Sequence, residues 1–328
     1  MATVTTTPTW STGSDRTVPS AALLDALDRQ VGYDARTRQG LSNHLPMELV
    51  ALDGLGAPAD RLEEMLERWT GHMLDERRDT TVFDAYRAEI GADGIDATVV
   101  EHLPRLVEAP SSEWFHSMIR LAYALDAGHQ GQVASALTDW TNYERLLPGD
   151  PPEGGDVAVL DGLRHLTDVE LEHGSHADLA AVARQDAFRD AVAGLRVDDT
   201  MDDVAHAAAA VHVAGADIGT LHLVTGTQAA RTVSRLTNAA VRHRLARRMV
   251  QAVAAGYVAS GAPALPDDRT LEGLRAARLP EWEEVRAAAV ASPDVHVTKL
   301  VYTCRIEVAA TGDPLYAWLA AREVGLVS

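Results

Sequence analysis

The sequence predicts an all-α protein. Apolar residues recur at spacings of three to four along nearly every segment from Ser20 onward, which is the period of amphipathic helices. Alternating runs with a period of two, which are typical of strands, are almost absent. With 328 residues, 46% of them hydrophobic, the chain can bury a large core. These properties exclude a disordered protein, which needs low hydrophobicity to stay unfolded.

The first predicted helix follows Ser20, whose hydroxyl can cap the apolar segment that ends at Asp28. A second helix, over residues 58–69, has Pro58 in its first turn, acidic residues early and an apolar stripe. Another apolar helix is expected to begin next to His44. The same periodicity predicts further helices over residues 97–107, 115–127, 130–146, 156–171, 177–194, 201–214, 228–259, 270–277, 281–291 and 295–311.

The predicted domain organisation is simple. Residues 1–19 are expected to be a disordered leader, and residues 20–328 a single large helical domain. Proline and glycine mark loops at 148–155 and 260–266, and neither loop is long enough for a flexible linker. The segment 148–155 is the place where two lobes of the domain would meet.

Charge and cysteine content exclude several classes of partner. Asp and Glu total 48 against 29 basic residues, a formal charge of −19, so nucleic acid is not an expected partner. Cys304 is the single cysteine and can form neither an internal disulfide nor a Cys-rich zinc site, which suits a reducing cytosol. Neither a run of about 20 apolar residues nor a signal peptide is present. We therefore expect a cytoplasmic protein with no membrane partner.

Lysine is nearly absent from the chain. Lys299 is the single lysine among 29 basic residues, and the others are arginine. A neutral lysine amine can act as a nucleophile or a base, or take up CO2 as a carbamate, and a guanidinium can do none of these. Chance survival of one surface lysine would explain the count equally well.

Four of the 13 histidines lie among apolar residues: His44, His116, His222 and His296. His296 and Lys299 are three residues apart, so they share one face of a helix. A single histidine on an apolar face is usually a packed core residue. Four of them, with the unique lysine one turn from the last, favour a shared metal ion, because neutral imidazole is the commonest metal ligand.

Four short segments resemble the motifs of one family. NHLPM at 43–47, followed by Ala51-Leu52 and by LGAP at 55–58, resembles the opening motif of the questin oxidase-like proteins. FH at 115–116 with RLAYAL at 120–125 resembles their second motif. LHLVT at 221–225 resembles a Met-His-x-x-Thr-Ser segment, with Gly226 where serine is usual, and HVTKL at 296–300 resembles the C-terminal His-x-x-Lys motif. The four segments occur in the family's order.

The resemblance implies a non-haem iron oxygenase. Family members open a quinone ring of anthraquinones in a Baeyer–Villiger-like step that cleaves a C–C bond. Carried over by motif, His44, His116, His222 and His296 would bind Fe(II) with their imidazoles, and Lys299 with a CO2-derived carbamate. His296 and Lys299 would be the catalytic pair. O2 is the implied co-substrate, and the electrons would come from the substrate or from a separate reductase.

The resemblance also implies a small aromatic substrate, such as an aromatic polyketide. Few aromatic side chains are available to stack on it, because Phe, Trp and Tyr make up only 5% of the chain. Those nearest the motifs are the candidates for a substrate pocket: Trp114, Phe115, Tyr123 and Tyr302, with Trp140 further away.

Two other functions stay open on the residues alone. A helical metallohydrolase of the HD phosphohydrolase type fits the architecture, but the adjacent His-Asp pair is missing, and Asp202, Asp217 and Asp294 lack a diagnostic spacing. A non-catalytic helical binding protein would hold the histidines in its core and bind no metal. His206 and His212 are six apart on an Ala-rich helix and do not share a face well, so they are candidates only for the surroundings of a site.

Overall fold

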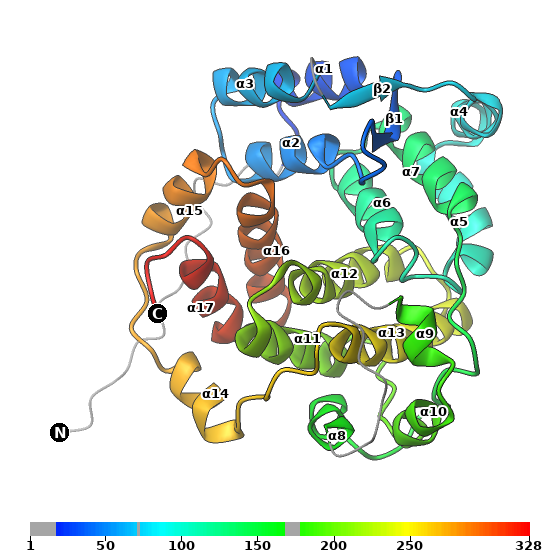
Figure 1. The fold of residues 1–328 in the computed structure, drawn as a ribbon. Helices are drawn as coiled ribbons and strands as arrows, with labels where there is room; N and C mark the ends of the chain where they lie inside the picture. Colours follow the sequence, from blue (N-terminus) through cyan, green and yellow to red (C-terminus); the bar gives the residue numbers. More distant parts are fainter. Residues whose placement is uncertain (1–17, 71–72, 168–177) are drawn as a thin grey trace.

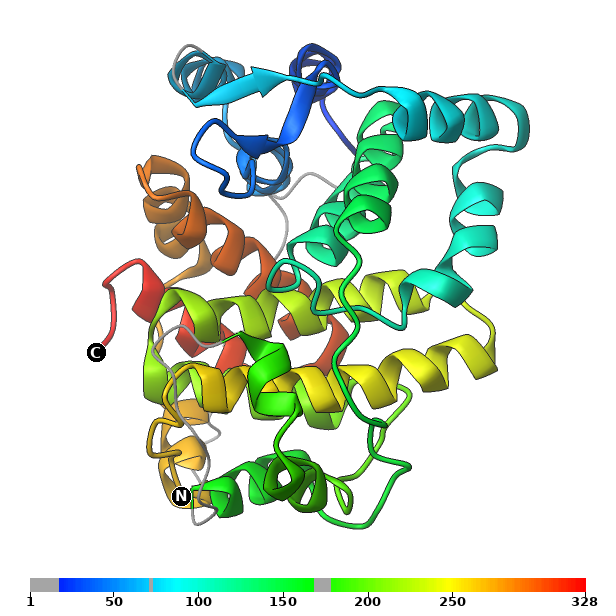
Figure 2. The ribbon, with the colours of Figure 1, turned by 45° about the vertical axis from the view of Figure 1, so that its right-hand side comes forward.

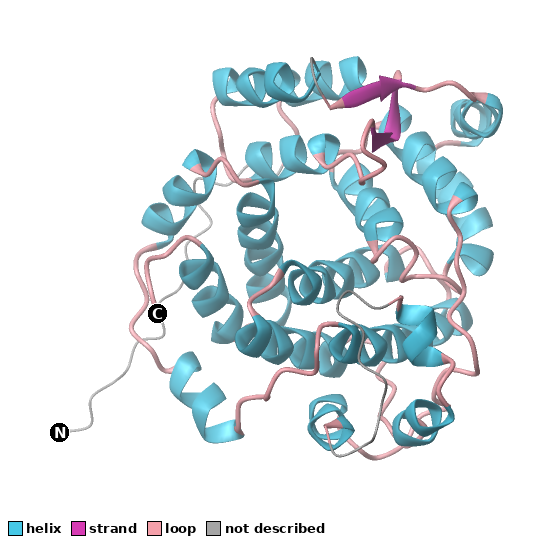
Figure 3. Cartoon of the chain, viewed as in Figure 1, coloured by secondary structure: helices cyan, strands magenta, loops and turns pink. Residues whose placement is uncertain are grey.

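The computed structural model describes residues 18–70, 73–167 and 178–328. In these ranges the chain forms 17 helices and one two-stranded sheet, so the predicted all-α class is confirmed (Figures 1 and 3). Most of the predicted leader, residues 1–17, lies outside the described residues. None of the helices described is both long enough and apolar enough to cross a membrane.

The N-terminal part of the chain contains the sheet. Ser20 caps the first helix as predicted, because its hydroxyl accepts a hydrogen bond from the amide of Leu23. The two strands pair antiparallel, and neither was predicted, since five and three residues are too few to show a clear two-residue period. The elements of this part are α1 (Ala21–Gln30), β1 (Tyr33–Thr37), α2 (Leu45–Gly54), α3 (Ala59–Thr70) and β2 (Leu74–Glu76).

The rest of the described chain is helical. Helices α4 and α17 were not predicted, and the prediction covered only residues 228–234 of α12. The other helices correspond to predicted segments with shifted ends. In chain order they are α4 (Thr81–Asp93), α5 (Ile95–Leu106), α6 (His116–Asp126), α7 (Gln130–Asn142), α8 (Val159–Leu166), α9 (Leu179–Ala183), α10 (Asp186–Val192), α11 (Asp202–Gly215), α12 (Ile218–Ser234), α13 (Ala239–Ala259), α14 (Asp268–Arg275), α15 (Trp282–Ala291), α16 (Val295–Thr311) and α17 (Pro314–Glu323).

Two of the predicted helices are each interrupted. The segment 177–194 is divided into α9 and α10 by a break at Arg184 and Gln185. The segment 228–259 belongs to α12 and α13, and Asn238 starts α13 by accepting a hydrogen bond from the amide of Val241. Apolar periodicity continues across both breaks. At the second break a polar residue, Asn238, caps the next helix, and such a residue carries no periodic signal.

Four helices form the centre of the molecule: α2, α6, α12 and α16. Helix α2 packs against α6 and α16, and α12 packs against the same two, so the four frame the middle of the fold (Figures 1 and 2). All ten residues of α2 are buried. Polar side chains on α2 therefore lie in the protein interior.

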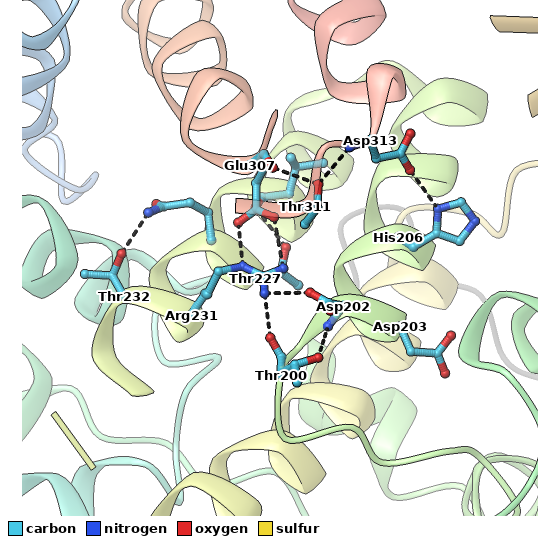
Figure 4. A network of polar contacts seen from close by, with 12 residues as sticks. Thr200, Asp202, Asp203, His206, Thr227, Arg231, Thr232, Glu307, Thr311 and Asp313 are labelled. Carbon is cyan, nitrogen blue, oxygen red and sulfur yellow. Dashed lines mark hydrogen bonds and ion pairs between the residues drawn. The ribbon is translucent and has the colours of Figure 1, made fainter. Parts of the chain in front are cut away.

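A buried ion pair holds α12 against α16 (Figure 4). Nε and one terminal nitrogen of Arg231 donate to the two carboxylate oxygens of Glu307 at 3.1 and 3.0 Å. The Glu307 side chain is completely buried. Arg231 also donates to Asp202 at the start of α11, at 2.7 Å. The pair fixes the position of one central helix along the other.

The connection between α7 and α8 includes residues 148–155. It is bound to α13, because Arg247 donates to the carbonyls of Pro151 and Pro152 and Gln251 donates to that of Pro148. A single domain with two lobes that meet at this segment stays a prediction.

Candidate metal centre

The four histidines singled out in the sequence lie at or near the N-terminal ends of the four central helices. His44 immediately precedes α2, His116 is the first residue of α6, and His296 is the second residue of α16. His222 lies in the second turn of α12. Helix N-termini carry positive partial charge, so their convergence favours neutral imidazoles and anionic ligands.

The structure brings the four imidazole rings together. Ring centroids are 4.4 Å apart for His116 and His222, 4.8 Å for His44 and His116, and 4.9 Å for His44 and His296. One ring nitrogen from each of His44, His116 and His222 lies within 4.8 Å of the others, which is a distance that one metal ion can bridge.

Three of the imidazoles direct one ring nitrogen at a hydrogen-bond acceptor and leave the other ring nitrogen without a proton. Nδ1 of His116 donates to the carbonyl of Glu113, and Nδ1 of His296 donates to the Asp294 carboxylate at 3.0 Å. The ring of His222 bonds to a main-chain carbonyl in its own helix. Each contact places the proton on Nδ1 and leaves a lone pair on Nε2. Nε2 of His222 and Nε2 of His296 are buried and have no hydrogen-bond partner among the described residues.

This donor set fits a metal ion. Buried polar atoms are nearly always hydrogen-bonded, so two orphaned imidazole nitrogens in one cluster need an explanation. Histidine ligands of metals typically donate their second ring N–H to a carboxylate or a main-chain carbonyl, which is the pattern seen here.

His44 connects the histidines to Lys299. Nζ of Lys299 lies 3.0 Å from Nδ1 of His44, and Nε2 of His44 lies 2.8 Å from Nε2 of His116. Because His116 carries its proton on Nδ1, the hydrogen in the second contact belongs to His44. A metal ion bound at that nitrogen requires this proton to move to Nδ1, where it would point at the Lys299 amine, so a bound metal favours the neutral form of that amine.

Burial keeps all four histidines neutral. Burial and the nearby Lys299 hold the pKa of His44 well below its usual range and lower the pKa of His116 to about 3. The pKa values of His222 and His296 are also lowered, mainly by burial. Neutral imidazole is the form that binds a metal.

Lys299 is a core residue, not a surface lysine. Its side chain is 2% exposed, and burial lowers its pKa to about 8, against the opposing effect of the Glu48 carboxylate. Glu48 is completely buried, and burial raises its pKa to about 8. Sequence reasoning missed Glu48, although an acidic residue four positions after His44 in a mostly apolar helix was a usable signal.

A left-handed turn sets the position of His116. Glu113, Trp114 and Phe115 have φ angles of 54°, 55° and 68°. This left-handed conformation costs a residue with a side chain about 1–2 kcal/mol. The turn packs on α12, where a β-carbon at Gly226 would lie 2.8 Å from the Phe115 ring. The absence of a side chain at Gly226, where serine is usual, makes room for that ring.

We expect Gly226→Ala to lower the free energy of unfolding by about 1–3 kcal/mol, because the added methyl overlaps Phe115. It should also weaken metal binding, since Phe115 immediately precedes His116. Urea unfolding and a metal titration would measure the two effects. Gly273→Ala is the matched control in α14, where a β-carbon would meet nothing within 4 Å and should stabilise the helix. Equal stability of both variants would show that the Phe115 contact does not position the turn.

The histidine cluster opens on a cavity of about 700 Å³. His116 and His222 line it, whereas His44 and His296 do not. This volume is typical of a pocket for a drug-sized molecule. The other lining residues are Arg36, Gly40, Leu41, Ser42, Ser111, Glu113, Trp114, Arg145, Leu146, Leu147, Pro148, Asp178, Leu179, Ala180, Arg184, Asp217, Ile218, Gly219, Ala259 and Ser260.

Of the four aromatic residues expected in a substrate pocket, Trp114 lines this cavity. Phe115, Tyr123 and Tyr302 do not. The Tyr123 hydroxyl donates to the Lys299 carbonyl at 3.3 Å, behind the cluster. Tyr302 donates to Asp126 and lines a separate cavity of about 290 Å³. The more distant Trp140 is fully buried and donates to a main-chain carbonyl.

Three other residues that the sequence brought to attention lie outside the histidine cluster: His206, His212 and Cys304. Nδ1 of His212 contacts the Thr220 hydroxyl at 2.9 Å, so this residue supports the start of α12. His206 faces Asp313, as Figure 4 shows. Cys304 is buried, and burial raises the pKa of its thiol well above the usual range, which does not favour a nucleophile.

Comparison with known proteins gives one family match. The sequence profile described as questin oxidase-like matches residues 65–304, which include His116, His222, His296 and Lys299 but not His44. No curated protein sequence matches the chain. The family match implies an oxidoreductase, of a kind that acts as an oxygenase on polyketides.

Proposed function

The chain belongs to the questin oxidase-like family, and we propose that it is a non-haem iron(II) oxygenase acting on an aromatic polyketide such as an anthraquinone. The reaction would cleave a C–C bond by Baeyer–Villiger-like insertion of an oxygen atom from O2. The observation that carries the proposal is the convergence of four imidazoles, three of them close enough to share one ion, with the only lysine of the chain, beside a cavity of ligand size.

In this proposal His44, His116, His222 and His296 hold the iron, together with a carbamate on Lys299. Bound iron would supply Lewis acidity and the means to activate O2. Carboxylation joins the neutral Lys299 amine to CO2 and releases one proton. The lowered pKa of Lys299 makes the neutral amine accessible, and the converging helix N-termini stabilise the anionic product.

The protein's own residues would place the substrate on one side of the cluster. His116 and His222 face the cavity, so the substrate would approach along their edge. Trp114 offers a flat face for an aromatic ring. The buried remainder of the cluster excludes water from His44, Lys299 and Glu48. Electrons would come from the substrate or from a separate reductase.

Elemental analysis and oxygen uptake test the function. Protein prepared without a metal-affinity step should contain about one iron per chain and consume O2 only when an anthraquinone is present. Turnover that continues without O2 would favour a hydrolase instead. Absence of metal after anaerobic loading with iron(II) would overturn the proposal.

The carbamate has its own test. With ¹³C-labelled CO2 we expect a carbamate resonance that grows between about pH 7 and 9, because the pKa of Lys299 is about 8 and only the neutral amine reacts. CO2 pressure must stay constant, since bicarbonate speciation changes with pH. Lys299→Met leaves the N-terminus as the only amine that could react, so it identifies the source of the signal. An equal signal in both proteins would assign it to the N-terminus and contradict the carbamate.

A further inference from the structure

The cavity beside His116 and His222 is lined by as many arginines as acidic residues, although the chain as a whole is strongly acidic. The whole protein carries a formal charge of −19. Three arginines line the cavity (Arg36, Arg145 and Arg184), and three acidic residues balance them (Glu113, Asp178 and Asp217).

The three acidic residues are all engaged by groups of the protein. Glu113 forms an ion pair with Arg36. The Asp178 carboxylate accepts from the amide of Ala180 at 3.0 Å, and the Asp217 carboxylate accepts from the amide of Thr220 at 2.7 Å. Each of these two carboxylates therefore caps a helix.

The arginines differ in how firmly they are held. Arg36 donates to the carbonyl of Gly40 at 2.9 Å, stacks on Tyr143 at 3.9 Å and contacts Glu113. The ion-pair distances of Arg145 and Arg184 are 4.0 Å to Glu113 and 3.8 Å to Asp178, which are too long for hydrogen bonds. Their side chains are 79% and 60% exposed. Two guanidinium groups at the cavity can thus bind an added anion.

Apolar residues surround the same opening. Leu41, Leu146 and Ile218 line the cavity and are 61%, 53% and 51% exposed. Exposed apolar side chains gathered at one cavity mark a binding surface for an apolar body. The lining therefore suits a ligand that combines a flat apolar body with an acidic group at the solvent side.

We propose that the substrate carries a carboxylate, which Arg145 and Arg184 bind at the mouth of the cavity while its rings extend toward His116 and His222. This inference rests on the proposed function, since it names the substrate class of that site. Guanidinium groups suit the role because they bind carboxylates through two parallel hydrogen bonds. Arg145 and Arg184 are thereby specificity-determining residues, distinct from the cluster that would perform the chemistry.

Equilibrium binding tests the proposal with two matched probes, anthraquinone-2-carboxylate and anthraquinone-2-carboxamide. Calorimetry under argon on the full chain as purified measures binding without turnover. The carboxylate should bind at least about ten times more tightly than the carboxamide, and less tightly as salt increases. The double variant Arg145→Gln, Arg184→Gln should reduce this ratio to about one. Arg38→Gln is the matched control, because Arg38 is half-exposed, pairs with Asp75 and does not line the cavity.

The outcomes separate this inference from the proposed function. A preference for the carboxylate that depends on both arginines supports the inference even if iron-loaded protein consumes no O2. Equal binding of the two probes, binding of neither, or a preference that survives the double variant overturns it. The oxygenase proposal would survive those results if a neutral quinone still supported oxygen uptake.

Discussion

Lys299→Met is expected to prevent stoichiometric iron binding and to lower anthraquinone-dependent oxygen uptake by at least about 100-fold. The variant removes the amine that would become the anionic ligand, while methionine fills a similar volume in the core. Lys299→Arg should be equally inactive, because a guanidinium stays charged and does not form a carbamate. Iron analysis and an oxygen electrode measure the two effects.

The free energy of unfolding of Lys299→Met shows whether a loss of activity comes from the missing amine or from a loss of stability. Replacement by an apolar side chain removes the cost of burying the amine but also its contact with Nδ1 of His44, so the free energy of unfolding should fall by no more than about 1–3 kcal/mol. His212→Gln is the matched control, a buried histidine outside the cluster that should keep its iron. Normal iron content and oxygen uptake in Lys299→Met would contradict the assigned role of Lys299.

Arg231→Met is expected to reduce the free energy of unfolding by about 3–5 kcal/mol. The Glu307 carboxylate is completely buried and would lose the guanidinium that neutralises it. The contacts of Arg231 with Thr200 and Asp202 would be lost as well (Figure 4). Urea unfolding followed by circular dichroism measures the change.

Two further variants distinguish a buried unpaired charge from a general loss of packing. Arg231→Met combined with Glu307→Leu should recover most of the stability, because no carboxylate is then left unpaired. Arg29→Met removes an equally bidentate pair with Glu63 whose side chains are nearly half exposed, and should cost less than about 1 kcal/mol. Similar losses for Arg231→Met and Arg29→Met would show that burial of Glu307 does not matter.

Local patterns in the sequence were sufficient for the class of fold and for several helix starts. The periodic spacing of apolar residues identified most helices, and the Ser20 cap lies where it was predicted. The breaks at Arg184–Gln185 and before Asn238 were not found, because the apolar pattern continues through them. Helices α4 and α17 were also missed.

In the candidate site, too, the sequence identified some residues and missed others. Each of His44, His116, His222 and His296 stood out because a titratable ring in an apolar helix needs a partner, and Lys299 because it is unique. Glu48 was missed, since its burial beside Lys299 depends on how α2 packs against α16.

The sequence by itself determined that this protein is helical and which histidines and lysine were unusual, because periodicity and composition are properties of neighbouring residues. Only the tertiary structure decided that these side chains meet, as in the contact of Lys299 with His44 across 255 residues of sequence. It also decided that Trp114 faces the cavity while Tyr123 and Tyr302 lie elsewhere. Contacts of this kind depend on how the central helices pack against one another, and no local pattern in the chain encodes that packing.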